Sequence, residues 1–560
     1  MPATVKIIKP SQFLILFIWI SLHNSSFSAP WVSLTSNYLQ ALSLAGQQDY
    51  QSAITILQRE LAKDSTFVPV YYRIAEFFIY QNKIHEGEKY FANLIKKQPD
   101  NPYNYLGLAY WTSLKDDWSM TFNNCTAAIK KGLLNRQIIE LLAQAAVKSG
   151  QTRLTSLHRV IRQKSKNFNN LLTTLINLHL KKFATVNKYF KRFKTNKTER
   201  WYLLYLEGKI NQQKQKFKTA ISSYIKAFNL NNIIDPFTKI ELYSLLGECY
   251  YKTNKADSAR YFLTLASDLA SQYGALNLNL KAISILVRID RETGDYVNLK
   301  HTVQKGIEIA QKFELARSYL IRFYFDYGQA IYSLGDFEHA LTIFSDISKK
   351  FSLSHPLDTK IKYLLGLCYY KLHEYNKAIE SLDKAMMEAS RFNIKNLLPD
   401  IYWQLAEIYE ILDNKKEAKR FYEKVLRYAQ NIQNYPLIEK CYLKLARLYI
   451  NFNNDNAHYY LTLADAFAKA TMQPYYTANH RWLEGVLNLH NQKFEQAEIY
   501  LKDALNLGKQ TLSLMSIICG RSGLSQLYDY INHPDLAQIH ADSATYLIKN
   551  YYNIIKQDLA

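Results

Sequence analysis

Residue types that could carry catalysis occur in this chain without the spacing that catalysis requires. Ser381 and Lys384 match the S-x-x-K spacing of a serine nucleophile, but they lie midway along a predicted helix, where lysine-rich sequence often produces such matches. His85 and His373 each precede a glutamate, yet neither has the second histidine that an H-E-x-x-H zinc site needs. The glycine-rich phosphate-binding patterns are also absent from the sequence. We therefore expect no catalytic activity, no cofactor and no metal site.

The cysteines are spread singly along the chain, each in a different predicted helix. A disulfide framework or a cysteine metal site would need close pairs or clusters, and the sequence has neither. We expect these residues to be small buried side chains with free thiols. They are Cys125, Cys249, Cys368, Cys441 and Cys519.

Positive charge is concentrated between Lys148 and Lys218. This stretch has 18 Lys and Arg against two acids, so it carries +16 of the net charge of +22. Such a field attracts anionic partners at long range and weakens with salt. The alternative is a solvated face of biased composition, although a merely soluble face normally mixes both signs. The candidate contact residues are Arg159, Arg162, Lys164, Lys181, Lys182, Lys188, Lys191, Arg192 and Lys194.

The elements that must position these residues are helical hairpins that repeat along the chain. In the stretch from Lys362 to Ala385, apolar residues at helical spacing form two short amphipathic helices with a polar turn between them. A small residue on the first helix, Gly366, permits close packing of the two helices. Equivalent small residues recur 38 to 41 residues apart, at Gly208, Gly247, Val287, Gly328, Gly366, Ala406, Ala446, Gly485 and Ser525.

The earlier part of the chain has a shorter repeat that resembles a known family. Small residues at Ala41, Ala75 and Gly107 are 34 and 32 residues apart. The second of these units resembles the tetratricopeptide repeat in the order and spacing of its aromatic, small and proline positions. The matching residues are Tyr71, Ile74, Ala75, Phe78, Ile84, Gly87, Phe91, Leu94 and Pro99.

The resemblance implies an all-α, right-handed superhelical solenoid of helix-turn-helix repeats, with about twelve clear units and two degenerate ones. We expect three repeats over residues 34–136, degenerate basic repeats over 137–199, nine repeats of about 40 residues over 200–550, and a tail over 551–560. The sequence leaves open whether residues 137–199 continue the superhelix or interrupt it.

In this family the first helix of each hairpin lines a concave groove that binds other proteins. In ten of the repeats we compared the residue that lies three positions before the small residue, and in six of them it is aromatic. Aromatic and arginine side chains are the usual anchors of peptide-binding surfaces, although these rings could equally pack between helices. The candidate groove residues are Tyr205, Arg288, Arg291, Arg322, Phe325, Tyr332, Tyr363, Tyr370, Trp403, Arg447 and Trp482.

The N-terminus resembles a secretory signal peptide over residues 1–28. Lys6 and Lys9 precede an apolar run from Phe13 to Leu22, and small residues at Ser26 and Ser28 favour cleavage after residue 28. An uncleaved membrane anchor is the alternative. We expect a secreted protein of the periplasm or cell envelope.

The leading interpretation is a non-catalytic scaffold for proteins or peptides, similar to the exported repeat proteins of Gram-negative bacteria. An alternative is a binder of anionic polymers or membrane surfaces that acts through residues 148–218. Its ligand would be an anionic lipid, a glycan or an acidic protein, because export would remove nucleic acid from its environment. A third reading is the sensory module of a signalling system.

Overall fold

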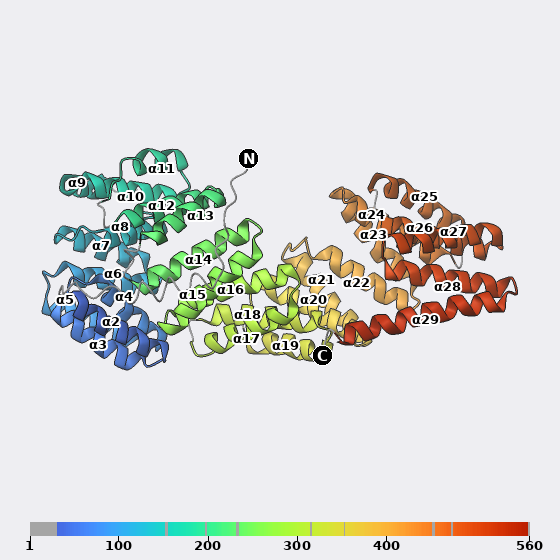
Figure 1. The fold of residues 1–560 in the computed structure, drawn as a ribbon, viewed down its shortest axis with the longest axis horizontal. Coiled ribbons are helices and arrows are strands. Elements are labelled where there is room, and N and C mark those ends of the chain that lie inside the picture. Colours follow the sequence, from blue (N-terminus) through green and yellow to red (C-terminus); the bar gives the residue numbers. More distant parts are fainter. Residues whose placement is uncertain are drawn as a thin grey trace. The chain divides into compact units, whose positions relative to one another are not determined.

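The computed structural model describes residues 31–151, 155–195, 199–230, 235–313, 316–351, 353–450, 454–471 and 474–557. The regular structure in these ranges is α-helical and contains no strand, and successive helices pair as hairpins (Figure 1). This confirms the predicted all-α solenoid. The predicted signal peptide lies outside the described residues.

The chain forms two compact units that divide at Phe323, inside helix α18. Unit 1 ends with the first part of α18 (Arg317–Ser333). Its preceding helices are α2 (Trp31–Gly46), α3 (Tyr50–Lys63), α4 (Val68–Tyr80), α5 (Ile84–Lys97), α6 (Pro102–Leu114), α7 (Trp118–Lys130), α8 (Arg136–Lys148), α9 (Thr155–Lys164), α10 (Lys166–His179), α11 (Phe183–Phe190), α12 (Arg200–Gln213), α13 (Phe217–Asn229), α14 (Pro236–Lys252), α15 (Ala256–Gln272), α16 (Leu276–Thr293) and α17 (Tyr296–Ala310).

Unit 2 begins at Tyr324, within α18. Its further helices are α19 (Phe337–Lys350), α20 (His355–Lys371), α21 (Tyr375–Arg391), α22 (Leu398–Ile411), α23 (Lys415–Asn431), α24 (Tyr435–Tyr449), α25 (Asn454–Thr471), α26 (Pro474–His490), α27 (Phe494–Gln510), α28 (Leu514–Tyr530) and α29 (Pro534–Gln557). No helix in the described ranges is both long and apolar enough to cross a membrane.

The small residue of each hairpin is the point where its two helices come closest. A Cβ added to Gly208 would lie 2.3 Å from the ring of Tyr224 on the next helix. No side chain can occupy that space unless the helices move apart. The same contact, with a partner sixteen residues later, recurs at Gly247 with Leu263, Gly328 with Phe344, Gly366 with Leu382, and Gly485 with Leu501.

The turns between paired helices are short and end in a capping residue. Gly335 has a φ of 86°, in the left-handed region that glycine favours. The next residue, Asp336, precedes α19, and its side chain accepts a hydrogen bond from the backbone N–H of His339. Such a cap satisfies one of the backbone donors that a helix start leaves unpaired. Gly335 and Asp336 thus form the turn between α18 and α19.

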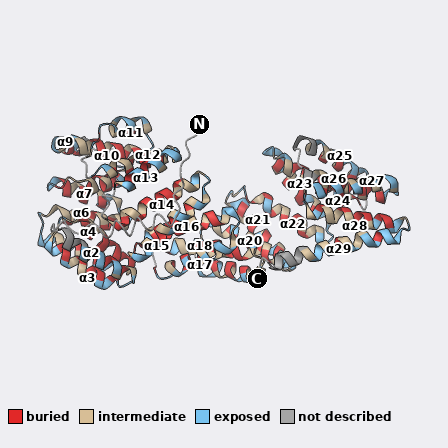
Figure 2. Ribbon diagram, viewed as in Figure 1, coloured by how far each residue is buried: buried red, intermediate tan, exposed pale blue. Residues whose placement is uncertain are grey.

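The basic stretch over residues 137–199 continues the stack of helices. Apolar residues of its helices are buried, including Leu142 on α8 and Leu171 on α10. They belong to one hydrophobic cluster that extends from Val68 to Cys249. The apolar faces of α8 and α10 thus join the repeats on either side, and the question left open by the sequence is answered for unit 1. Figure 2 shows buried residues where neighbouring helices meet and exposed residues on the outer faces.

Unit 1 also closes on itself. Helices α2 and α3, blue in Figure 1, lie against the green hairpins from α14 onwards. The Tyr38 hydroxyl donates a hydrogen bond of 2.9 Å to Asp235. The guanidinium carbon of Arg73 lies 3.4 Å from the ring centroid of Phe237. These contacts join residues far apart in the sequence, and the repeat pattern does not predict them.

Candidate partner-binding surfaces

The predicted aromatic row is partly exposed along the first helices of the unit 2 hairpins. Tyr363 on α20, Trp403 on α22 and Trp482 on α26 each keep part of their surface accessible. On α24 the row is interrupted, because Leu443 is only 6% exposed and belongs to the core. Tyr332 and Tyr370, the neighbouring candidates in this unit, are also partly exposed.

Trp403 lies beside a small network of charged side chains. The Lys440 ammonium lies 4.0 Å from the centroid of one Trp403 ring. Burial, more than the like charge of Lys444, lowers the pKa of Lys440. Lys444 itself forms ion pairs of 3.2 Å with Glu407 and 3.4 Å with Glu410. Trp403 is therefore held between charged groups while part of it stays accessible.

Glu410 is the centre of this network. It accepts a hydrogen bond of 2.8 Å from the Tyr422 hydroxyl, and its other oxygen lies 3.2 Å from Nε of Arg447. Arg447 keeps 53% of its side-chain surface exposed, so its guanidinium can contact a second group. The geometry fits a surface that receives a partner with both aromatic and acidic contacts.

Two of the predicted groove residues are buried, which corrects the prediction for them. Phe325 is 6% exposed in unit 2. Tyr205 is also 6% exposed in unit 1, where its hydroxyl donates a 2.6 Å hydrogen bond to Glu241. Burial, followed by the charge of Glu241, raises the pKa of Tyr205 well above its usual value. Both rings pack in the core because the position three residues before the small residue faces neighbouring helices in these hairpins.

The three remaining arginines of the predicted groove lie in unit 1. Arg322 is exposed, and Arg288 and Arg291 are partly exposed. The Arg288 guanidinium lies 6.0 Å from the ring of Tyr251. Their role in partner binding stays a prediction.

All nine predicted residues of the basic segment are exposed, on α9, α11 and the turns around them. We call these nine residues the basic face. Within the described ranges, none of them forms an ion pair with a carboxylate. Lys209, on α12, differs because it lies 3.2 Å from Glu241. The charge of the basic face is therefore not neutralised by the protein itself.

A cavity of about 330 Å³ lies in unit 1, and the sequence analysis did not identify it. It is built from the starts of four helices that are distant in sequence. No local motif could have revealed it, because the closure of unit 1 brings these segments together. The residues that line it are Thr66, Phe67, Val68, Pro69, Asn135, Arg136, Gln137, Trp201, Asp235 and Thr238.

Comparison with known families decides the family of this chain. Family models described as tetratricopeptide repeat match residues 322–393 and 399–432. The chain is a tetratricopeptide-repeat protein. These two matches include Tyr363 and Trp403, so these two residues of the predicted aromatic row lie on recognised tetratricopeptide repeats.

One curated relative is similar over 315 residues at 24% identity, namely response regulator aspartate phosphatase E of Bacillus subtilis (strain 168). The match covers 55% of this tetratricopeptide-repeat chain and 72% of the relative.

Two solved structures illustrate the likeness in fold. A tetratricopeptide repeat protein from Parabacteroides merdae is 19% identical, with a TM-score of 0.34, and the match covers 48% of this chain and 94% of that protein. The apo quorum sensor NprR from B. thuringiensis is 14% identical, with a TM-score of 0.42, and the match covers 67% of this chain and 99% of that protein.

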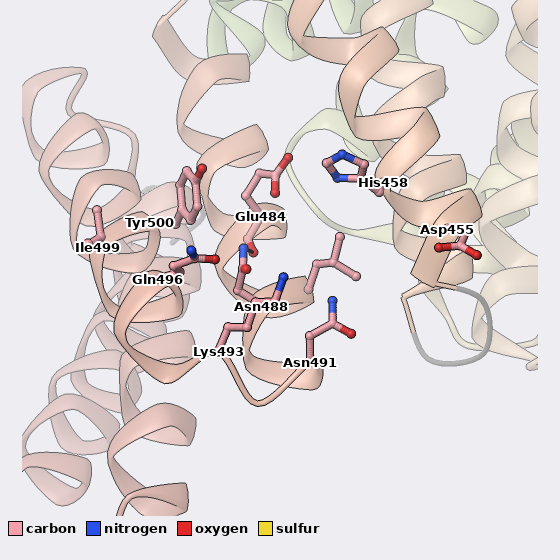
Figure 3. Close-up of a pocket in the computed structure, with 10 residues that line it drawn as sticks. Asp455, His458, Glu484, Asn488, Asn491, Lys493, Gln496, Ile499 and Tyr500 are labelled. Carbon is pink, nitrogen blue, oxygen red and sulfur yellow. Dashed lines mark hydrogen bonds between the residues drawn. The ribbon is translucent and has the colours of Figure 1, made fainter.

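A second cavity, of about 470 Å³, lies between α25, α26 and α27 of the tetratricopeptide repeats in unit 2. Figure 3 shows Glu484 and His458 pointing towards the space between their helices, while Lys493 and Tyr500 border the other side. Its lining mixes acids, bases and amides. In the described residues, no group of three or more His, Cys, Asp or Glu could hold a metal ion. No sequence motif marks any of these residues.

Proposed function

We propose that this tetratricopeptide-repeat protein is a non-catalytic scaffold that binds protein or peptide partners along the first helices of its unit 2 repeats. The observation that carries the proposal is the partly exposed Trp403 beside Lys440, with Tyr363 partly exposed on the preceding hairpin and Trp482 on the second hairpin after it. Aromatic rings in fixed positions contribute most of the energy of many protein interfaces because they bury a large area with little loss of side-chain freedom. The partner would be a protein or an extended peptide.

In-cell photo-crosslinking tests this proposal. A photoreactive amino acid at position 363 should capture a defined partner, and Trp403→Ala in the same chain should reduce that capture. The matched control carries the photoreactive group at position 459, because Tyr459 is 58% exposed on the second helix of a unit 2 hairpin. Equal capture from both positions would refute the proposal that the partner binds along the first helices of the unit 2 repeats. Loss of helicity in the Trp403→Ala variant, measured by circular dichroism, would show that this ring belongs to the core.

We place the scaffold in the periplasm or cell envelope. The support is the sequence of the first 28 residues, with an apolar run that follows Lys6 and Lys9. Export with cleavage should yield a mature chain that begins at Ala29, which N-terminal sequencing of the protein from its native cell would detect. An intact Met1 in the membrane fraction would favour the uncleaved anchor, and an intact Met1 in the cytosol would refute export.

A second candidate function is binding of an anionic membrane surface or polymer by the basic face. The observation that favours it is the exposure of all nine residues without an internal carboxylate partner in the described ranges. Unneutralised charges that lie close together gain most from an external anion.

A third candidate is a regulatory module of a signalling system. It is supported by the name of the curated relative, which is a phosphatase of response regulators. The partner captured from position 363 tests this third function. A regulatory module requires that partner to be a signalling protein, and capture of any other protein would refute it.

A further inference from the structure

The cavity of unit 1 contains an arginine that the protein leaves without a polar partner. Arg136, at the start of α8, lines the cavity and lies beside two aromatic rings. Its guanidinium carbon lies 4.9 Å from the ring centroid of Trp201 and 4.5 Å from that of Tyr202. These rings attract the charged guanidinium without satisfying its hydrogen bonds.

The donors of Arg136 are not matched within the protein. Its Nε is buried and has no hydrogen-bond partner. No described carboxylate lies close enough to form an ion pair with it. Guanidinium groups have five N–H donors, and a buried donor without an acceptor is unfavourable because it has lost its hydrogen bonds to water. An arginine that is positioned and unpaired in this way is suited to a ligand that brings its own acceptor.

The cavity also contains Asp235, whose carboxylate is already engaged. Its Oδ1 accepts a hydrogen bond of 2.9 Å from the Tyr38 hydroxyl. Its Oδ2 accepts hydrogen bonds from the backbone N–H and the hydroxyl of Thr238, at 3.3 Å and 3.2 Å. Asp235 therefore forms no ion pair with Arg136, but its negative charge, like that of Glu140 beside Tyr202, would oppose a doubly charged ligand more than a singly charged one. This favours a single carboxylate over a dianionic phosphate.

We propose that this cavity binds one carboxylate of a partner peptide, with Arg136 as its anchor. A carboxylate can accept two parallel N–H bonds from a guanidinium, a geometry that a lysine cannot provide. Phe67, Val68 and Pro69 offer an apolar wall for the residue that carries the carboxylate or for its neighbour. A volume of about 330 Å³ accommodates one or two residues of a peptide. The inference rests on the proposed partner-binding function.

Affinity selection from peptide libraries tests the inference on the full-length chain. Fluorescent acetylated hexapeptide amides would carry Glu, Gln, Lys or phosphoserine at one fixed position among randomised residues. A further library would have Gln at that position and a free C-terminal carboxylate. Comparison with the Glu library distinguishes a side-chain carboxylate from a C-terminal one. We expect the strongest enrichment for the Glu library, the free-carboxylate library or both. Enrichment should be weaker for the Gln library and weakest for the Lys library.

Arg136→Gln is the decisive variant, and Arg59→Gln is its matched control, because Arg59 is exposed on α3 outside both the cavity and the basic face. We expect the best acidic peptide to bind Arg136→Gln about tenfold more weakly or worse, and Arg59→Gln unchanged. Arg136→Lys keeps the charge and should recover only part of the affinity, which a general structural role would not predict. Circular dichroism melting curves verify that each variant is folded.

Two results would overturn the inference. One is an unbiased selection, without preference for a carboxylate over an amide. The other is equal binding by the Arg136→Gln and Arg59→Gln variants. A preference for phosphoserine over Glu would refute the inference that the negative charge of Asp235 disfavours a dianionic ligand. Capture from position 363 in unit 2 does not depend on Arg136, so failure of this inference is distinguishable from failure of the proposed function.

Discussion

The hydroxyl of Tyr38 donates a hydrogen bond to Asp235, a residue 197 positions later in the chain. Tyr38 is only 3% exposed, and burial followed by the charge of Asp235 raises its pKa well above the usual value. The bond joins α2 to the start of α14 and so helps to close unit 1. It also occupies one oxygen of the carboxylate that shares a cavity with Arg136.

Replacement of Tyr38 by Phe should loosen this closure. A hydrogen bond to a charged group contributes roughly 1.5–3 kcal/mol, so local opening of α2 should become about tenfold more frequent or more. Hydrogen–deuterium exchange of the α2 backbone would measure the change. Tyr435→Phe on α24 is the control, because Tyr435 is 47% exposed. Unchanged exchange in α2 would show that the remaining contacts of the closure suffice.

Gly208→Ala should destabilise the α12–α13 hairpin. The new Cβ would lie 2.3 Å from Cε1 of Tyr224, a ring that is fully buried and hydrogen-bonded to Gln212. Overpacking of this kind costs about 1–3 kcal/mol. Urea denaturation followed by circular dichroism would measure it, with the exposed Ser222→Ala on α13 as control. A loss no larger than that of the control would contradict the close-contact role of this glycine.

The thiols should be nearly inert in the native protein. Cys125, Cys249, Cys368 and Cys441 are buried, and Cys519 is partly exposed. Burial raises the pKa of Cys249, Cys368 and Cys441 to about 12, so their reactive thiolate forms are rare at neutral pH. A thiol-reactive dye should label Cys519 first and all five thiols only after denaturation. Rapid native labelling of Cys368 would contradict this order.

The basic face should bind acidic vesicles in a salt-dependent manner if it is a functional surface. Vesicles of phosphatidylcholine with added phosphatidylglycerol should retain the protein at low salt. They should release it towards 1 M salt, because the screening length falls from about 10 Å at 0.1 M to about 3 Å. Triple reversal of Lys188, Lys191 and Lys194 to Glu should abolish retention. Cosedimentation measures both effects.

The matched control for this experiment is a triple reversal in unit 2. Lys349, Lys395 and Lys416 are exposed lysines on separate hairpins or turns. Their reversal changes the net charge by the same amount without altering the basic face. Equal loss of binding in both triple variants would attribute the effect to net charge, and binding insensitive to salt would refute this candidate.

Prediction of the surface residues from the sequence succeeded only in part. The small residue of each repeat marks the first helix. The two helices that present Tyr363 and Trp403 could therefore be identified from the sequence. Tyr205 and Phe325 have the same position in their repeats, yet both are buried. Exposure at that position depends on how far neighbouring hairpins cover it. That coverage varies along the stack and is not encoded by the spacing.

The sequence by itself determined the stack of hairpins, because the contacts that build each one are local. Gly208 and Tyr224 lie sixteen residues apart, within a single repeat, so their periodic recurrence is visible in the chain. Only the tertiary structure decided the closure of unit 1 and the cavity beside Arg136. These depend on the cumulative rotation of successive hairpins, which brings Tyr38 to Asp235 across 197 residues. Small differences in packing at each repeat add up over that distance, and no sequence spacing records their sum.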